Sequence, residues 1–251
     1  MSVRTATYTY GDVMNVVGKS ATNRANEDDL AAFICNVGTN LLWQRYDWRE
    51  SISTLPPFYL IPDEQDHGAP AVIVPTNFWG LRKVWLMKNA TTPPYKQDMT
   101  ILKDLALTHV RYLPQSISYN SASRSFRVFP RVPPSIGAPD YCVSGEYKIK
   151  PTKITAANIA STLLPFDDVY FQTWVEVLKW ASLNIAGDPR AGDVNYTNGQ
   201  KVASGQLAKA YAAIDEMART ENLEGGDVTI SPSEPLINMN RLWPAGLGWG
   251  M

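Results

Sequence analysis

The segment from Pro165 to Gly187 constrains the fold more than any other part of the sequence, because it combines a long helical pattern with almost no polar face. Its polar residues form one narrow stripe, which consists of Asp168, Gln172, Glu176 and Lys179. A helix of about 34 Å that is apolar on nearly every side has to be buried on nearly every side. We therefore expect it to pack inside a helical domain and also against a second subunit, through Tyr170, Trp174, Val177 and Trp180.

Three further segments have helical patterns. A short helix is expected from Tyr10 to Val17. A second is expected from Asn26, as its N-cap, to about Trp43, because apolar residues recur with helical spacing at Leu30, Phe33, Ile34, Val37 and Leu41. A third, rich in alanine, is expected from Lys201 to Thr220.

Between Tyr46 and Pro151 the pattern changes to short apolar runs separated by Pro, Gly, Asn and Ser, which predicts strands. The expected strands are residues 58–61, 71–74, 84–87, 126–129 and 141–149. The last of these alternates strictly, so that one face carries Tyr141, Val143, Gly145, Tyr147 and Ile149. A brief helix is also expected at residues 100–110.

Together these patterns predict an α+β fold for the 251 residues, a length that suits one large domain or two small ones. Residues 1–45 and 152–225 would form a helical bundle domain from the two ends of the chain. Residues 46–151 would form an inserted antiparallel β-domain, sandwich or barrel-like, and residues 226–251 an extended C-terminal arm.

The composition limits the class of partner. The formal net charge is -1, only 19% of residues are charged, and 11% are aromatic. Binding to nucleic-acid phosphates needs a basic patch. The nearest approach to one is Arg124, Arg127 and Arg131, which a strand would split between its two faces, so a solvated edge is expected there. Few charges and many aromatics are typical of proteins with extensive interfaces.

Residues that could carry catalysis are sparse. Gly18-Lys19-Ser20 resembles the end of a phosphate-binding loop, but Val13 stands where that motif needs glycine, so a helix end is expected. His67 and His109 are isolated and are expected at or near the surface. Asp167-Asp168 is explained by the start of a helix, whose dipole favours acids. We expect no enzymatic activity, no cofactor and no metal.

The two cysteines, Cys35 and Cys142, are expected to be buried free thiols, which suits a reducing compartment. The first residues lack the apolar run of a secretion signal, because Arg4, Thr5, Thr7 and Asp12 interrupt it. The sequence also contains no stretch typical of a transmembrane helix. These features predict synthesis and folding in a cytoplasm.

The C-terminal arm from Gly226 follows neither a helical nor a strand period, yet it is rich in apolar residues. Extended chain of this kind would be poorly solvated alone. We expect it to anchor on a neighbouring subunit or a partner protein through Leu236, Ile237, Leu242, Trp243 and Trp249. Folding back on its own subunit is the alternative.

The order of motifs along residues 10–225 resembles a known family. Tyr46-x-Trp48-Arg49 follows the acid-started helix, and Tyr59-Leu60-Ile61-Pro62 ends a strand. The sequence then continues with Val74-Pro75-Thr76-Asn77-Phe78-x-x-Leu81-x-x-Val84, Pro139-x-Tyr141-x-Val143-x-Gly145-x-Tyr147-x-Ile149-x-Pro151 and Leu164-Pro165. In this order the chain resembles the head-to-tail adaptor (connector) proteins of tailed bacteriophages. Asn77 replaces the usual acid of that pattern, and the arm from Gly226 is longer than the family core.

The resemblance implies a structural virion protein that is not an enzyme and that forms a ring beneath the portal, with twelve copies as the family's expectation. The implied partners are further copies of the chain, the portal protein, and a downstream tail nozzle or tail fibre protein. Genomic DNA would pass through the channel without sequence-specific binding, and no membrane is involved. The virion would assemble in the host cytoplasm, and the apolar arm would meet a neighbouring subunit or the portal.

Three other functions stay open from the sequence. The chain could be another ring component of a phage neck or tail, such as a stopper, tail terminator or baseplate protein. It could be a carbohydrate-binding module that stacks sugars on Trp48, Trp79 and Trp85. It could also be a hydrolase with a dispersed site.

Overall fold

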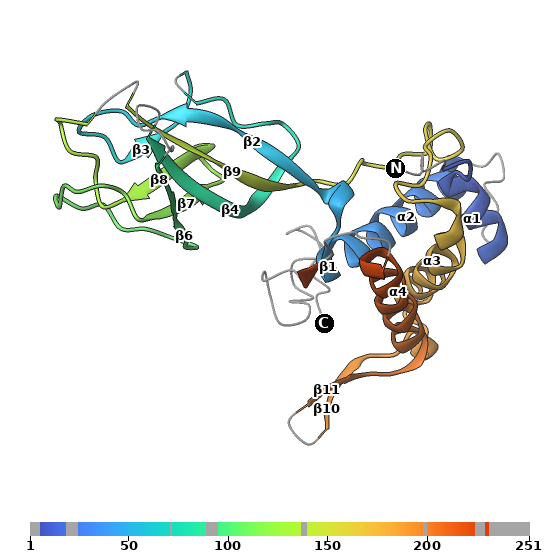
Figure 1. Cartoon of the computed structure of the whole chain (residues 1–251). Helices are drawn as coiled ribbons and strands as arrows, with labels where there is room; N and C mark the ends of the chain where they lie inside the picture. The colour runs from blue at the N-terminus through green and yellow to red at the C-terminus, as the bar shows by residue number, and fades with distance from the viewer. Residues whose placement is uncertain are drawn as a thin grey trace, which may run out of the picture. The chain divides into compact units, whose positions relative to one another are not determined.

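The computed structural model describes residues 6–18, 25–70, 72–88, 95–136, 140–197, 200–223 and 229–230. The chain divides into two compact units. The helical unit comprises Met1–Glu50 and Pro151–Met251, and the β unit comprises Ser51–Lys150. The fold is thus α+β, as predicted (Figure 1). The expected boundaries, 45/46 and 151/152, lie close to those of the two units.

The helical unit is organised around helix α3 (Phe171–Ile185). It contacts α1 (Tyr10–Val17), α2 (Ala25–Arg45) and α4 (Gly205–Leu223), so helices from both ends of the chain cover it. The approach of α2 is close, since a Cβ placed on Gly38 would lie 2.5 Å from Leu178 Cδ2. The apolar character of α3 is therefore accounted for by neighbours within one chain.

Helix α3 begins later than its sequence pattern predicts. The α-helix starts at Phe171, after a 3-10 turn η2 (Asp168–Tyr170), and not at Pro165. Asp167 caps this turn by accepting a hydrogen bond from the Val169 N–H, 3.2 Å away. The Asp168 carboxylate accepts from the backbone N–H of Thr7 (2.9 Å) and of Tyr8 (3.2 Å), so it also holds the segment before α1. As expected, the two acids belong to a helix start.

The second helix also begins earlier than predicted. Because α2 starts at Ala25, Asn26 lies inside the helix and not at its N-cap. Of the predicted apolar stripe, Ile34, Val37 and Leu41 are buried, whereas Leu30 and Phe33 are exposed.

The β unit contains two four-stranded sheets, neither of which closes into a barrel. The first has the order β2 (Ile52–Tyr59), β9 (Tyr141–Ile149), β4 (Phe78–Lys88), β5 (Tyr95–Asp98). The second has the order β3 (Asp66–His67), β8 (Ser125–Phe129), β7 (Ser116–Asn120), β6 (Thr100–Ile101). All pairs are antiparallel except β6 with β7.

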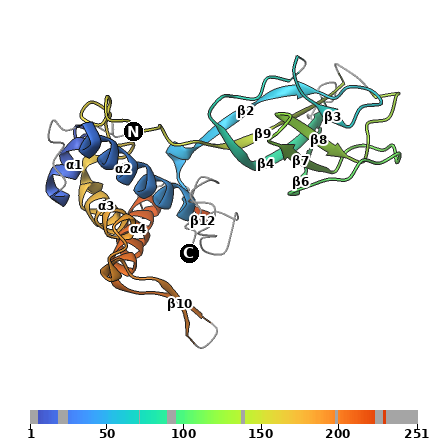
Figure 2. The ribbon, with the colours of Figure 1, turned by 180° about the vertical axis from the view of Figure 1, so that it is seen from behind.

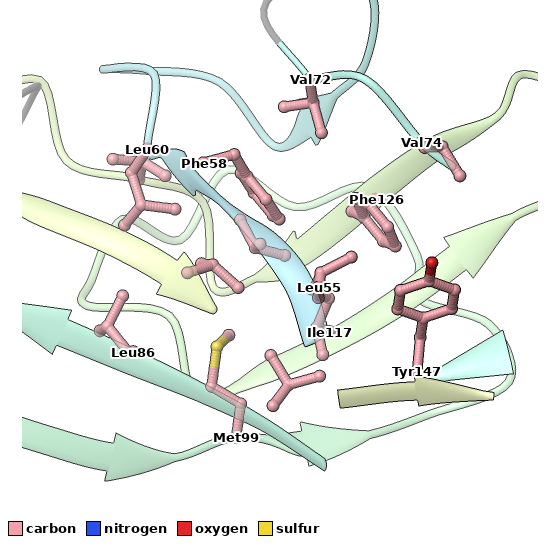
Figure 3. Packing of buried hydrophobic residues seen from close by; sticks show 14 of the residues in the cluster. Leu55, Phe58, Leu60, Val72, Val74, Leu86, Met99, Ile117, Phe126 and Tyr147 are labelled. Carbon is pink, nitrogen blue, oxygen red and sulfur yellow. The ribbon is translucent and has the colours of Figure 1, made fainter. Parts of the chain in front are cut away.

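Both sheets contribute to one hydrophobic core, seen in Figure 3. Phe58 of β2 stacks on Phe126 of β8 with ring centroids 5.3 Å apart. Strand β9 has the predicted bounds, and its alternation is confirmed, since Val143 and Tyr147 lie in the core and Tyr141 and Ile149 pack against its edge. The core thus joins segments that are far apart in the sequence.

Two predicted elements of the β unit are wrong. Residues 72–74 form no strand, although Val72 and Val74 are buried and Ile73 is exposed; Ala71 lies outside the described residues. Residues 100–110 form no helix, because the backbone N–H groups of Thr100 and Leu102 donate instead to Gln115 and Ile117 of the neighbouring chain segment. In both cases contacts with distant segments override the local pattern.

His67 is buried completely, which corrects the expectation of a surface position. Its Nε2 accepts a hydrogen bond from the Ile61 N–H (3.1 Å), so Nδ1 carries the proton and donates to the Gln65 carbonyl (3.2 Å). Burial lowers the pKa of His67 below its usual range, which keeps the ring neutral. The imidazole therefore serves to satisfy backbone groups in the interior.

We expect the Gly145→Ala substitution to destabilise the β unit by about 1–3 kcal/mol. A Cβ at this position would lie 2.3 Å from the Lys83 carbonyl oxygen, which β4 cannot move without breaking the sheet. Gly80→Ala is the matched control on β4, because no atom lies within 4 Å of its added Cβ. Urea denaturation of both variants checks this, and equal midpoints would contradict it.

We expect acid to weaken the β unit through His67. Because the folded state holds the ring neutral, the unfolded state binds a proton that the folded state does not, and stability falls as the pH drops below about 6.5. The loss is at most about 1.4 kcal/mol per pH unit. Denaturant unfolding over this range should show a steeper pH dependence for the natural chain than for His67→Gln. Parallel curves would exclude the effect.

Candidate functional site

A β-hairpin that projects from the helical unit is the most distinctive exposed feature of the structure. Strands β10 (Val194–Thr197) and β11 (Gln200–Ala203) pair only with each other among the described strands. Figures 1 and 2 show the hairpin leading away from the ends of α3 and α4. The expected helix 201–220 is wrong at its start, because β11 occupies residues 200–203 and α4 begins at Gly205.

The sequence contained a signal for this hairpin that the analysis above missed. Thr197 pairs with Gln200, so the connection consists of Asn198 and Gly199. Asn-Gly is the preferred two-residue hairpin connection because both residues tolerate positive φ. Val194 and Tyr196 before it, with Val202 after it, are typical strand residues.

The base of the hairpin is clamped by close backbone contacts. It follows the 3-10 turn η3 (Pro189–Ala191), and Gly192 next to it has φ 77° and ψ 165°, a conformation that only glycine adopts readily. A Cβ on Gly192 would lie 2.0 Å from the Ser204 carbonyl oxygen. The backbone N–H of Asp193 donates to Ser204 Oγ (3.0 Å), and that of Ser204 donates to the Asp193 carbonyl (3.0 Å). The hairpin therefore leaves the helices in a defined direction.

Beyond this base the hairpin offers apolar surface to solvent. Tyr196 is 71% exposed and Val202 is 48% exposed. A two-stranded sheet is at best marginally stable in water by itself. Exposed tyrosine on a rigid projection is typical of a residue that anchors an interface.

The C-terminal arm begins with a short pairing to its own chain. Strand β12 (Thr229–Ile230) is antiparallel to β1 (Tyr46–Asp47), with Tyr46 opposite Ile230. The predicted anchors Leu236, Ile237, Leu242, Trp243 and Trp249 lie outside the described residues. The pairing places the start of the arm beside the end of α2.

The end of α2 is itself fixed to α4 by a charged cluster. Arg45 donates from Nε and Nη2 to the two carboxylate oxygens of Asp215 (3.0 and 2.9 Å), and the Tyr46 hydroxyl donates to the same carboxylate (2.9 Å). The Arg45 guanidinium also lies 4.2 Å from the Tyr211 ring centroid. Burial raises the pKa of Tyr211 to about 12, so this phenol stays neutral. The cluster fixes the position of β1, and with it the first residues of the arm.

The four residues expected to contact a second subunit, Tyr170 of η2 and Trp174, Val177 and Trp180 of α3, lie in the interior of their own chain. Tyr170 is 5% exposed, Trp180 is 1% exposed, and Trp174 and Val177 are fully buried. Trp174 makes ring contacts with Tyr10 and with Phe166. Because α1, α2 and α4 already cover α3, these side chains leave no surface for a neighbouring copy.

Cys35, Cys142 and Gly18, which were considered for their chemistry, have structural roles: they are buried or belong to a helix end. Cys35 and Cys142 are free and buried, as predicted, and burial raises the pKa of Cys35 to about 12. Gly18 ends α1 in the left-handed conformation, whereas Lys19 and Ser20 lie outside the described residues. In the described part of the chain no group of three or more His, Cys, Asp or Glu side chains could hold a metal ion.

The three arginines considered as a basic patch, Arg124, Arg127 and Arg131, make contacts within the chain. Arg127 donates to both carboxylate oxygens of Asp66 (2.7 and 2.9 Å), and Arg131 donates to the Asp63 carbonyl (2.6 Å). Arg124 donates to the Val74 carbonyl (3.0 Å). They brace loops against β8, while Arg124 stays exposed and Arg127 and Arg131 are half-buried, so the expected solvated edge is present in part.

The tryptophans of the carbohydrate-binding alternative do not form a platform. Trp48 is fully buried and donates from its indole nitrogen to the Leu42 carbonyl (2.7 Å). The Lys96 ammonium lies 3.9 Å from the Trp85 ring centroid, so it covers that face. Half-buried Trp79 is then the third ring of the set, and a single ring is too little to stack an oligosaccharide.

Comparison with known proteins assigns no family, since no family model and no curated protein matches the chain. No helix among the described residues is both long enough and apolar enough to cross a membrane. The geometry of the hairpin and of the arm is therefore the basis for a functional proposal.

We expect Gly192→Ala to destabilise the helical unit by about 2–4 kcal/mol, since it adds backbone strain and overlap with Ser204. It should also speed tryptic cleavage after Lys201, because the hairpin loses its clamp. Gly187→Ala is the matched control: Gly187 also has positive φ, 67°, but no atom lies within 4 Å of the added Cβ. Its expected cost is about 1 kcal/mol, without faster cleavage. Equal cleavage rates in the two variants would contradict the clamp.

Proposed function

We propose that this chain is a structural protein of a tailed bacteriophage virion, the head-to-tail adaptor that forms a ring beneath the portal. The observation that carries the proposal is the clamped hairpin, which extends from the helical unit with exposed Tyr196 and Val202. A rigid projection of this kind is suited to a neighbouring copy, and repeated contact between different surfaces closes a ring when the rotation permits.

The two-unit architecture supports the same function. In this proposal the helices form the bundle that makes up the body of the ring, and the β unit is the platform on which a tail nozzle or tail fibre protein docks. The chain order of helix, inserted β unit, long helix and final helix is the order on which the resemblance rests. Stacking of the two sheets as a β-sandwich belongs to the proposal as well.

The charge of the chain suits a DNA conduit. A strongly basic wall would bind the genome's phosphates and slow its passage. The formal net charge is -1, and the three arginines closest to forming a patch are held by Asp63, Asp66 and Val74 of the same unit. DNA passing through such a ring would meet no sequence-specific site.

The C-terminal arm is proposed to reach a neighbouring subunit or the portal. Its start is fixed at the β1–β12 pair, and the apolar anchors Leu236, Ile237, Leu242, Trp243 and Trp249 follow within the next residues. Tryptophan is strongly represented among residues that dominate binding energy. The arm would then attach the ring to the structure above it.

The test is native mass spectrometry and negative-stain imaging of the purified chain, alone and with the portal protein of the same phage. We expect a closed ring on the portal, with a mass that is a whole multiple of the chain's own. A chain that stays monomeric with and without the portal would refute the adaptor function. A ring that ignores the portal but binds tail proteins would favour a stopper, tail terminator or baseplate component.

A truncation after Gly225 tests the arm in the same assay. We expect the truncated chain to keep its helical circular dichroism but to lose most of its affinity for the portal or the ring. A second variant replaces Trp243 and Trp249 with serine in the full-length chain. It removes two anchors and leaves the backbone intact. Unchanged assembly of both variants would exclude the anchoring role.

A further inference from the structure

A second exposed apolar surface lies at the opposite end of α3 from the hairpin. We define the α3 N-terminal patch as Tyr8, Leu163 and Val169, which are 43%, 50% and 66% exposed. Backbone contacts join the segments of Tyr8 and Leu163, since Thr9 forms a β-bridge with Leu163 and the Leu164 N–H donates to the Tyr8 carbonyl (2.9 Å). The Tyr8 N–H donates to the carboxylate of Asp168, the residue before Val169 (3.2 Å). The Tyr8 ring also lies 4.5 Å from that of Phe171, centroid to centroid.

The patch is bordered by carboxylates that are fixed in place. Asp12 accepts a hydrogen bond from the Thr9 N–H (2.8 Å), and Asp167 caps the Val169 N–H. Hydrogen bonds from Thr7 and Tyr8 lower the pKa of the Asp168 carboxyl, so it is ionised at neutral pH. The patch therefore combines an apolar centre with a negative border.

The hairpin has the complementary character. Its sequence from Val194 to Ala203 contains no acid and one cation, Lys201. Exposed Tyr196 pairs with Lys201 and so lies on the same face of the hairpin, whereas exposed Val202 pairs with Asn195 on the other face. An apolar surface with one positive charge matches an apolar surface with a negative border, and such complementarity favours one orientation of docking.

The hairpin cannot reach the patch of its own chain. The 15 residues of α3 separate them by about 22 Å, and the glycine clamp directs the hairpin away from the N-terminal end of α3 (Figures 1 and 2). The two surfaces can therefore meet only between copies. Because they differ, each copy would present the hairpin to one neighbour and the patch to the other, which is the head-to-tail contact that rings require.

We propose that the β10–β11 hairpin of one copy docks on the α3 N-terminal patch of the next. Tyr196 contacts the apolar centre of the patch, on the hairpin face that it shares with the register position of Lys201. The inference rests on the proposed ring and goes further by naming both surfaces of its subunit contact.

Cysteine cross-linking tests the contact directly. The native Cys35 and Cys142 are buried, so a short bismaleimide should react mainly with introduced thiols. Val202→Cys and Val169→Cys chains, mixed, should give a cross-linked dimer with one copy of each. A chain with both substitutions should give a ladder that ends at the size of the ring. Excess dimers within the Val202→Cys chain alone would show hairpin-to-hairpin contact and overturn the proposal.

A charge substitution gives a second readout. Val169→Asp should weaken self-association at least tenfold in sedimentation velocity, since it buries a carboxylate in the contact. Val110→Asp is the matched control, because Val110 is 61% exposed but belongs to the β unit. Rings that form equally well with Val169→Asp, and without the mixed cross-link, would refute this contact and leave the adaptor function standing. A natural chain that forms no ring would refute both.

Discussion

The burial of α3 is the constraint on which the rest of the molecule depends. Its apolar residues need covering on several sides, and the covering comes from α1 and α2 before the β unit and from α4 after it. The helical unit is therefore complete only when the two ends of the chain meet. Helices α2 and α3 pack closely at Gly38, since even a methyl group there would overlap Leu178.

This arrangement explains why the helix expected to contact another subunit is buried within its own chain. The sequence shows that α3 is apolar on nearly every side, but it does not show how many neighbours its own chain supplies. The side chains of Trp174 and Trp180 are buried inside the helical unit. Exposed apolar residues are present at both ends of α3, on the hairpin and on the α3 N-terminal patch. Surfaces at the ends of a buried helix suit contacts along a row of copies.

Much of the fold could be predicted from local pattern, and the failures share a cause. Strand β9 was predicted at its observed bounds because its apolar residues alternate, and Val143 and Tyr147 of that face lie in the core. The opposite face is not fully exposed, since Cys142, Ser144 and Lys148 are buried as well. The helix predicted at residues 100–110 and the strand predicted at residues 72–74 were wrong, because the backbone or side-chain partners of these residues lie far away in the sequence. His67 was misplaced because polarity suggests exposure, whereas its ring nitrogens satisfy two backbone groups.

Prediction of the candidate site from the sequence was limited in the same way, because local patterns do not show contacts with distant segments. The alanine-rich run after residue 200 led to the prediction of a helix that begins at Lys201. The preceding Asn198-Gly199 pair favours a hairpin turn, because both residues tolerate positive φ, and it was not taken into account. The clamp at Gly192 could not have been foreseen, because its reason is a carbonyl oxygen twelve residues later. The apolar character of the arm was legible from the sequence, but its starting pair with β1 was not.

The discontinuity of the helical unit has a consequence for synthesis. The β unit is one continuous stretch, Ser51–Lys150, so all of its strands are translated before α3 is. The first two helices emerge earlier but wait for α3 and α4, and β1 waits longest, for residues 229–230. A chain released early would thus carry a finished β unit beside unpaired helices. If the proposed ring forms, a chain would become competent to join another copy only near the end of translation, so unfinished chains would stay out of the ring.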